Sequence, residues 1–117
     1  MTVQEYGEKI AELVVEGDWP RIEPEIHGIN LPDRWQEKIK PIFDDLKGRN
    51  VEVKVIPFSK LSDLSLHWLK MAPAEILERT KNAVTIAYSD GDGENSGSID
   101  LAVYERDGRC SILMVGG

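Results

Sequence analysis

A two-residue turn close to the C-terminus, Asp107-Gly108, constrains the fold more than any other feature of this sequence. Both residue types tolerate positive φ, and such a pair between two apolar runs is the strongest short signal for a β-hairpin. The flanking runs, residues 99–104 and 110–115, have the composition of strands, and residues 84–88 form a third run of this kind. We therefore expect a meander of three antiparallel strands at this end of the chain.

The N-terminal part of the chain has the three- and four-residue periodicity of helices. Thr2 and Glu5 have the spacing of a capping box, and Gly17 supplies a left-handed stop, so a first helix is expected between them. Apolar residues keep helical spacing over residues 18–29 and again over residues 33–46. We expect a second and a third helix there, with prolines limiting the regularity of both.

The middle of the chain combines a strand with two shorter helices. Residues 51–55 alternate at period two, which predicts a half-buried strand ended by Pro57. Period alone does not decide between a helix and a strand over residues 61–71, and we favour the helix. A further helical turn begins at Pro73 and is expected to stop at Asn82.

These elements together predict one α+β domain over residues 1–117, with the helices on one face of an antiparallel sheet. The length is typical of a single domain. A hydrophobic fraction of 41% and a charged fraction of 30% are those of a globular protein.

The charge balance limits the partners that this chain is expected to have. Lys and Arg number 14 against 21 Asp and Glu, which gives a formal net charge of −7. Such a surface repels phosphate backbones and anionic lipids and attracts basic proteins. We therefore expect no nucleic-acid or membrane partner. The other explanation of the negative charge, that it only keeps the protein soluble, stays open.

Cysteine usage and the N-terminal residues favour a cytoplasmic protein. Cys110 is the single cysteine, so neither an internal disulfide nor a cysteine-based zinc site is expected. The first residues have neither the positive charge nor the apolar run of a secretory signal. No stretch reaches the roughly 18 apolar residues that a membrane span needs.

Two segments and the order of the elements resemble the nuclear transport factor 2-like (NTF2-like) superfamily, also called SnoaL-like or cystatin-like. Residues 14–19, Val-Val-Glu-Gly-Asp-Trp, resemble the junction between the first two helices of that group. Residues 103–109 are similar to its C-terminal hairpin. The resemblance implies N-terminal helices packed in the concavity of a curved antiparallel sheet, with more strands than the four expected here. The superfamily includes isomerases, dehydratases, carriers and immunity proteins, so the fold does not select a function.

The resemblance also implies an enzymatic alternative. Family enzymes use Asp, Tyr and His side chains lining a cone-shaped pocket, and the corresponding candidates here are His67, Tyr88, Asp100 and Tyr104. A carboxylate beside apolar walls and a phenol would suit the acid–base chemistry of an isomerase or dehydratase. Strand alternation argues against this, because it places Asp100 and Tyr104 on the face opposite the apolar residues of the same strand.

No metal or cofactor site is expected. Residues 90–95, Asp-Gly-Asp-Gly-Glu-Asn, carry oxygen ligands at alternate positions, as calcium loops do. The sixth position is Asn95 instead of glycine, and the twelfth is Leu101 instead of glutamate, so a polar hairpin loop is the better interpretation. His27 and His67 are too far apart in sequence for a zinc helix, and His27 is interpreted as a surface turn residue. Catalytic serine and glycine-rich phosphate motifs are also absent from the sequence.

We expect a small acidic protein-binding module rather than an enzyme. Its most concrete form is an immunity protein that neutralises a basic toxin. The carboxylates expected to meet the partner are Asp44, Asp45, Asp90, Asp92 and Glu94. The alternative is a small-molecule carrier or acid–base enzyme with a cone-shaped pocket. A homodimer formed through the sheet face is a third option, because an exposed sheet face often needs a cover.

Overall fold

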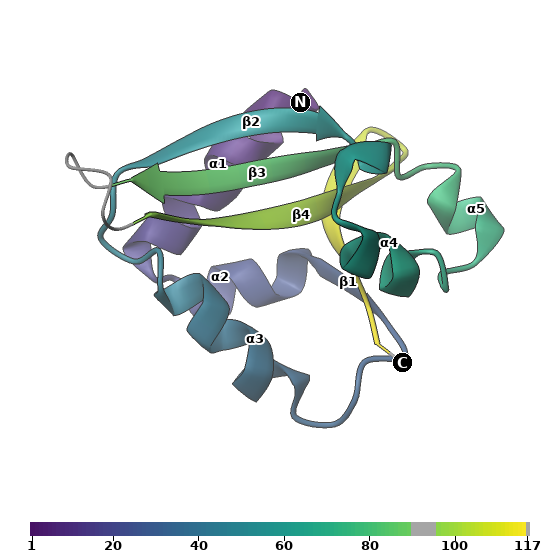
Figure 1. Cartoon of the computed structure of the whole chain (residues 1–117), viewed down its shortest axis with the longest axis horizontal. Coiled ribbons are helices and arrows are strands. Elements are labelled where there is room, and N and C mark those ends of the chain that lie inside the picture. The colour runs from purple at the N-terminus through teal and green to yellow at the C-terminus, as the bar shows by residue number, and fades with distance from the viewer. Residues whose placement is uncertain (90–95, 117) are drawn as a thin grey trace.

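One mixed sheet of five strands organises the chain (Figure 1). The computed structural model describes residues 1–89 and 96–116. The strand order is β1-β5-β4-β3-β2, and every neighbouring pair is antiparallel except β1 with β5, which is parallel. The strands are β1 (Ile26–Ile29), β2 (Val51–Pro57), β3 (Asn82–Ser89), β4 (Ser96–Arg106) and β5 (Arg109–Val115).

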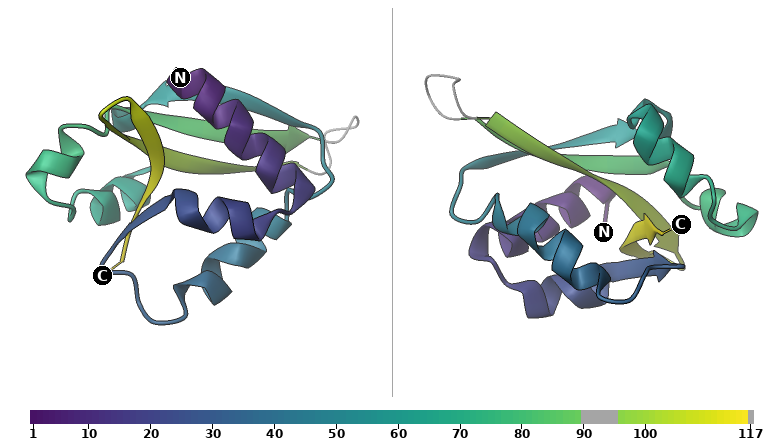
Figure 2. Two further views of the ribbon diagram at one scale, coloured as in Figure 1. Left: turned by 180° about the vertical axis from the view of Figure 1, so that it is seen from behind. Right: turned by 60° about the horizontal axis from the view of Figure 1, so that its bottom comes forward.

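Within the described residues, five α-helices and two 3₁₀ turns accompany the sheet. The helices are α1 (Val3–Glu16), α2 (Trp19–Ile22), α3 (Trp35–Asp44), α4 (Asp63–Leu69) and α5 (Ala74–Leu77). The 3₁₀ turns are η1 (Glu23–Glu25) and η2 (Phe58–Lys60). Seen from behind, α1 lies across the back of the sheet (Figure 2). None of the described helices has the length and apolar character that a membrane crossing requires.

Local sequence signals are confirmed at both ends of the chain. Thr2 accepts a hydrogen bond from the Glu5 backbone, and Glu5 accepts one from the Thr2 backbone, which forms the expected capping box. Gly17 ends α1 at φ +70°. Asp107 and Gly108 have φ values of +52° and +77° and join β4 to β5 by a two-residue turn. The helix favoured over residues 61–71 is α4.

The prediction of a helix over residues 18–29 is wrong for its second half, because residues 26–29 form β1. Ile26 pairs with Ile112, and Ile29 pairs with Val115. Residues three apart in a strand face opposite sides of the sheet. Ile26 accordingly packs in the hydrophobic cluster under α1, and Ile29 packs in a second cluster on the other face. The three-residue spacing that suggested a helix therefore places apolar side chains in two hydrophobic clusters, one on each face of the sheet.

Helices cover both faces of the sheet, which corrects the prediction that they share one face. The first cluster joins α1 to inward residues such as Ile86 and Ile112. The second cluster joins Leu66 of α4 and Ile76 of α5 to Ala102 and other residues of the opposite face. The helical turn after Pro73 ends at Leu77, so Asn82 begins β3 instead of stopping a helix.

β4 is longer than the ladder that it forms with β5. The two strands pair only from Ala102–Leu113 to Arg106–Arg109, whereas β4 pairs with β3 from Ser96 onward. The end of β5 pairs with β1 instead. In Figure 1, β5 bends away from β4 and runs down toward the C-terminus. Residues 96–101 of β4 therefore form an open edge, with a paired strand on one side only.

Replacing Gly7 by alanine is expected to destabilise the fold. A Cβ atom at Gly7 would lie 2.7 Å from Cγ1 of Val84 and 2.9 Å from Cγ1 of Val53. Overpacking of this kind costs about 1–3 kcal/mol, which exceeds the gain of up to about 1 kcal/mol in helix propensity. Urea unfolding of Gly7→Ala should show a lower free energy of unfolding than the wild type. The exposed control Glu12→Ala should stay within about 0.5 kcal/mol, and a stabilised Gly7→Ala would contradict the close approach.

Candidate functional site

A pocket of about 500 Å³ opens beside the open edge of β4. This volume lies within the roughly 300–1,000 Å³ of small-molecule sites, and apolar groups dominate its surface. Its walls come from α3, from α4 and from the segment after β1, and its floor comes from β4 and the end of β5. The lining residues are Leu31, Pro32, Trp35, Lys38, Ile39, Ile42, Phe43, Leu61, Ser65, Trp68, Leu69, Ser98, Ile99, Asp100, Leu101, Ala102, Leu113, Met114, Val115 and Gly116.

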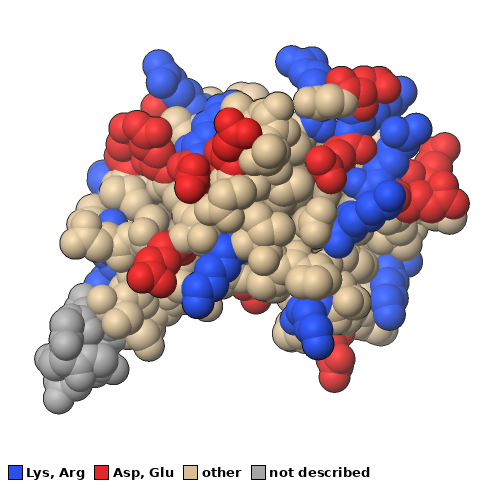
Figure 3. All heavy atoms as spheres, turned by 90° about the horizontal axis from the view of Figure 1, so that it is seen from above, with Lys and Arg blue, Asp and Glu red and all other residues tan. Residues whose placement is uncertain are grey.

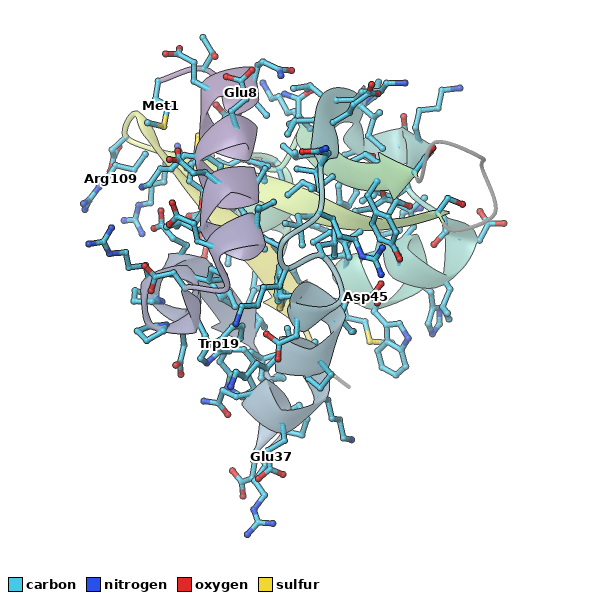
Figure 4. All side chains as sticks on the ribbon, turned by 90° about the vertical axis from the view of Figure 1, so that its left-hand side faces the viewer. Met1, Glu8, Trp19, Glu37, Asp45 and Arg109 are labelled. Atoms are coloured by element: carbon cyan, nitrogen blue, oxygen red, sulfur yellow. The ribbon has the colours of Figure 1, made fainter. Side chains whose placement is uncertain are left out.

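The α3 wall is an apolar stripe supported from behind by α2. Trp35, Ile39 and Phe43 follow one another at four-residue steps, so they lie on one side of the helix. The Trp19 ring of α2 lies 6.3 Å from the ring of Trp35 and 5.9 Å from that of Phe43. Figure 4 shows Trp19 between α1 and α3. This packing fixes the wall without filling the pocket.

The α4 wall is shorter and more exposed. Ser62 caps α4 by accepting a hydrogen bond from the Ser65 backbone at 3.2 Å. Trp68 lines the pocket and is still 40% exposed. Leu64 and Met71, also on or just after this helix, are more than half exposed. The mouth of the pocket is therefore bordered by apolar side chains.

Charged side chains line the pocket from the floor and from the α3 wall. Thr85 Oγ1 donates a 2.7 Å hydrogen bond to Oδ1 of Asp100, directly across the β3–β4 ladder. This bond holds the Asp100 side chain on the strand face opposite Ile99 and Leu101. Lys38 lines the pocket from the α3 side. A ligand would thus meet a carboxylate and an ammonium group on different sides of an apolar space.

The four residues of the enzymatic alternative do not converge on one point. Asp100 lines the pocket, whereas His67 is exposed on α4 and lies outside the lining. Tyr104 is buried in the second cluster, on the same face of the sheet as Asp100 but without solvent exposure. Tyr88 packs in the first cluster, on the opposite face. The arrangement therefore lacks the acid–base constellation that the resemblance implied.

The structure also corrects the interpretation of His27 as a surface turn residue. His27 lies in β1 instead of a surface turn, and its ring packs 4.9 Å from the ring of Tyr104. Both side chains belong to the packed face of the sheet between β1 and β4. Among the described residues, no group of three or more His, Cys, Asp or Glu side chains is arranged to hold a metal ion. The loop weighed as a calcium site, residues 90–95, lies outside the described residues.

The carboxylates expected to bind a partner are only partly described. Asp44 and Asp45 are exposed at the end of α3, and Figure 4 shows Asp45 at the end of this helix nearest the sheet. Asp45 accepts a 3.1 Å hydrogen bond from the Tyr88 hydroxyl. The Arg49 guanidinium lies 4.1 Å from the centre of the Tyr88 ring, so a cation shares this surface. Asp90, Asp92 and Glu94 lie outside the described residues.

The surface charge is mixed instead of uniformly acidic on the face seen from above (Figure 3). Lys and Arg side chains alternate there with Asp and Glu side chains among the described residues. Among the described residues, Lys9 and Glu25 form an ion pair at 2.9 Å that joins α1 to η1. The net charge of −7 therefore does not create one acidic field on this face.

Two titratable groups away from the pocket, buried Tyr6 and partly buried Cys110, have raised pKa values. Burial raises the pKa of the Tyr6 phenol well above its ordinary value, and the Glu25 carboxylate adds to the shift. The Tyr6 hydroxyl is buried without a hydrogen-bond partner among the described residues. Burial also raises the pKa of the Cys110 thiol, with the Glu105 carboxylate contributing. A raised thiol pKa lowers the thiolate fraction, so Cys110 is not an activated nucleophile.

Comparison with solved structures finds the same fold in a Campylobacter jejuni protein, provisionally described as an NTF2-like transpeptidase and solved at 2.00 Å resolution. The match covers 97% of this chain and 99% of that chain, with a TM-score of 0.50 and 8% sequence identity. The chain therefore has an NTF2-like fold, as the order of its elements predicted. At this identity the likeness concerns the fold alone. No protein-family model and no curated protein matches the sequence.

Removing the orphaned hydroxyl of Tyr6 is expected to stabilise the protein. Tyr6→Phe should raise the free energy of unfolding at pH 7 by about 1 kcal/mol, because a buried polar group without a partner is costly. The wild type should also lose stability as the pH rises above about 10, where tyrosine ionises in the unfolded chain while the raised folded pKa keeps Tyr6 neutral. Urea unfolding at pH 7 and pH 10.5 measures both effects. The difference between the two proteins should widen at the higher pH, and a destabilised Tyr6→Phe would contradict this account.

Proposed function

We propose that this chain is a non-enzymatic binding module whose ligand occupies the pocket between α3, α4 and β4. The pocket itself carries the proposal, because it combines a volume of about 500 Å³ with mostly apolar walls and a few polar groups. Its walls are pre-formed, since α2 supports α3 and a capping serine begins α4. A pre-formed site lowers the ordering cost of binding.

Binding is favoured over catalysis by the surroundings of Asp100. A general base normally sits in apolar surroundings that raise its pKa toward the working pH. Asp100 is instead exposed to solvent and accepts a hydrogen bond from Thr85 across the β3–β4 ladder. Its role in the proposed function is to orient a polar group of the ligand.

Filling the pocket is expected to abolish binding of an apolar ligand. The neutral dye N-phenyl-1-naphthylamine should bind the wild type with increased dye fluorescence. Ser65→Phe adds an aromatic ring to the lining and should weaken dye binding at least about tenfold, which corresponds to about 1.4 kcal/mol.

The matched control is His67→Phe, which adds the same ring to α4 outside the pocket lining. Its dye affinity should equal that of the wild type, and far-ultraviolet circular dichroism should show both variants folded. An equal loss in both variants, an undiminished affinity in Ser65→Phe, or no dye binding at all would each refute the pocket as the ligand site.

The acidic protein-binding function, in its concrete form an immunity protein against a basic toxin, is the second proposal. Its support among the described residues is the adjacent, exposed pair Asp44 and Asp45 at the end of α3. Asp45 is engaged by Tyr88, so Asp44 is the better candidate for contact with a partner. The carboxylates Asp90, Asp92 and Glu94 belong to the same proposal on sequence grounds.

Electrostatic steering gives this second proposal a kinetic test. With a basic partner isolated on the immobilised protein, Asp44→Asn should lower the association rate and flatten its dependence on salt. The combined Asp90→Asn, Asp92→Asn and Glu94→Gln variant should act in the same direction. Glu12→Gln removes one exposed charge from α1 and serves as the control for net charge. Identical rates for all variants would exclude these carboxylates from the interface.

A further inference from the structure

The open edge of β4 directs backbone hydrogen-bonding groups into the pocket. The Glu105 N–H donates to the Arg79 carbonyl, at the N-terminal approach to β3, at 3.0 Å. The backbone N–H and C=O groups of successive residues point alternately to the two sides of a strand. Those of Glu105 therefore point to the β3 side, and those of the even-numbered residues, such as Ala102, point to the β5 side. By the same alternation, Ser98 and Asp100 direct their N–H and C=O groups to the side where β5 is missing. Within residues 1–89 and 96–116, no hydrogen bond engages these backbone groups.

This edge differs from the two outer edges of the sheet. The β2 edge carries Glu52, Lys54 and a terminal proline, and β1 is only four residues long. Charged residues, proline and short length are the usual protection of an edge strand against pairing with other chains. Over residues 98–101 the β4 edge has no proline and a single charged side chain, Asp100. Residues of α3 and α4 line the pocket beside this edge.

We infer that the pocket binds an extended peptide segment, which pairs with residues 98–101 of β4 as an added strand. The inference rests on the binding function proposed above and names its ligand class. Four residues of β4 span about 13 Å, which matches a segment of four or five residues. A peptide backbone supplies donors and acceptors at the spacing that the free N–H and C=O groups of Ser98 and Asp100 require.

Charge complementarity defines which segment fits. Side chains directly opposite in paired strands lie on the same face, so the residue across from Asp100 lies beside its carboxylate. No Lys or Arg of the described chain forms an ion pair with Asp100, and Thr85 is its hydrogen-bond donor. Lysine or arginine in the segment would supply the missing cation at this position.

The neighbouring segment residues face the other wall. Residues across from Ile99 and Leu101 point toward α3, where Trp35 and Ile39 form an apolar surface. Lys38 on the same wall repels a cation, so basic residues are selected only on the Asp100 side. The preferred segment therefore alternates apolar and polar residues, with a basic residue at its centre.

The probe is the peptide acetyl-Thr-Val-Lys-Val-Thr-amide, whose side-chain pattern is the same in both chain directions. Titration into the ¹⁵N-labelled protein should shift the amide signals of Ser98 and Asp100 and slow their hydrogen exchange. The peptide with glutamate in place of lysine should bind at least about fivefold more weakly. In Asp100→Asn, this preference for lysine over glutamate should disappear.

Backbone methylation of the peptide tests pairing without changing the protein. If the segment runs antiparallel to β4, methylating the backbone nitrogen of the lysine should abolish binding. If the segment runs parallel to β4, methylating the backbone nitrogen of the second valine should abolish binding. One of the two peptides should bind and the other should not. Equal binding of both methylated peptides and the parent would overturn strand pairing.

Protein variants give an independent readout of the same edge. Ser98→Pro removes an N–H that faces the pocket and leaves the β3 ladder intact, so it should abolish peptide binding. Ser98→Ala keeps this N–H, so its loss of peptide affinity should be much smaller than that of Ser98→Pro. If Ser98→Pro fails to fold, as its amide spectrum would show, the methylated peptides decide the question.

The dye separates failure of this inference from failure of the proposed function. A protein that binds N-phenyl-1-naphthylamine in a Ser65→Phe-sensitive manner but not the peptide keeps its pocket function, and the peptide inference is overturned. A protein that binds neither refutes both. Peptide binding without any change at the amides of Ser98 and Asp100 places the contact elsewhere and also overturns the inference.

Discussion

The parallel pairing of β1 with β5 determines most of what is distinctive in this structure. β5 pairs with β4 along one edge and with β1 along the other edge, but over different parts of its length. The ladder with β4 ends at Leu113, and the ladder with β1 runs from Ile112 to Val115. β5 is therefore drawn away from β4 toward its C-terminal end. The chain that leaves β1 then carries α3 to the far side of the resulting space, and the pocket lies between them.

Packing on both faces of the sheet stabilises the arrangement in which β5 diverges from β4. The strand β4 contributes Leu101 and Val103 to the core under α1, and Ala102 and Tyr104 to the core under α4 and α5. The core under α1 also holds Leu101 of the unpaired half, so this half needs no contact with β5 to stay in place. Asp100, on the opposite face of the same half, is exposed, whereas Tyr104, four residues later, is buried.

Local signals in the sequence predicted the elements that depend on neighbouring residues. Thr2 with Glu5 and Asp107 with Gly108 act over three residues or fewer, so their outcome does not depend on the rest of the fold. β1 was missed because Ile26 and Ile29 obtain their strand partners from a segment more than 80 residues away. The walls of the pocket were not predicted for the same reason, although a cone-shaped pocket was the alternative expectation and Asp100 was among its candidate residues.

The point at which β5 leaves β4 sets the size of the site without involving either core. Each additional residue pair in the β4–β5 ladder would shorten the free edge by about 3.4 Å, and each pair lost would lengthen it by the same amount. The two-residue turn at Asp107-Gly108 lies at the far end of the hairpin and would not need to change. Among chains of this architecture, the length of the β4–β5 ladder can therefore vary while the helices stay in place. Pockets of different lengths can evolve in this way.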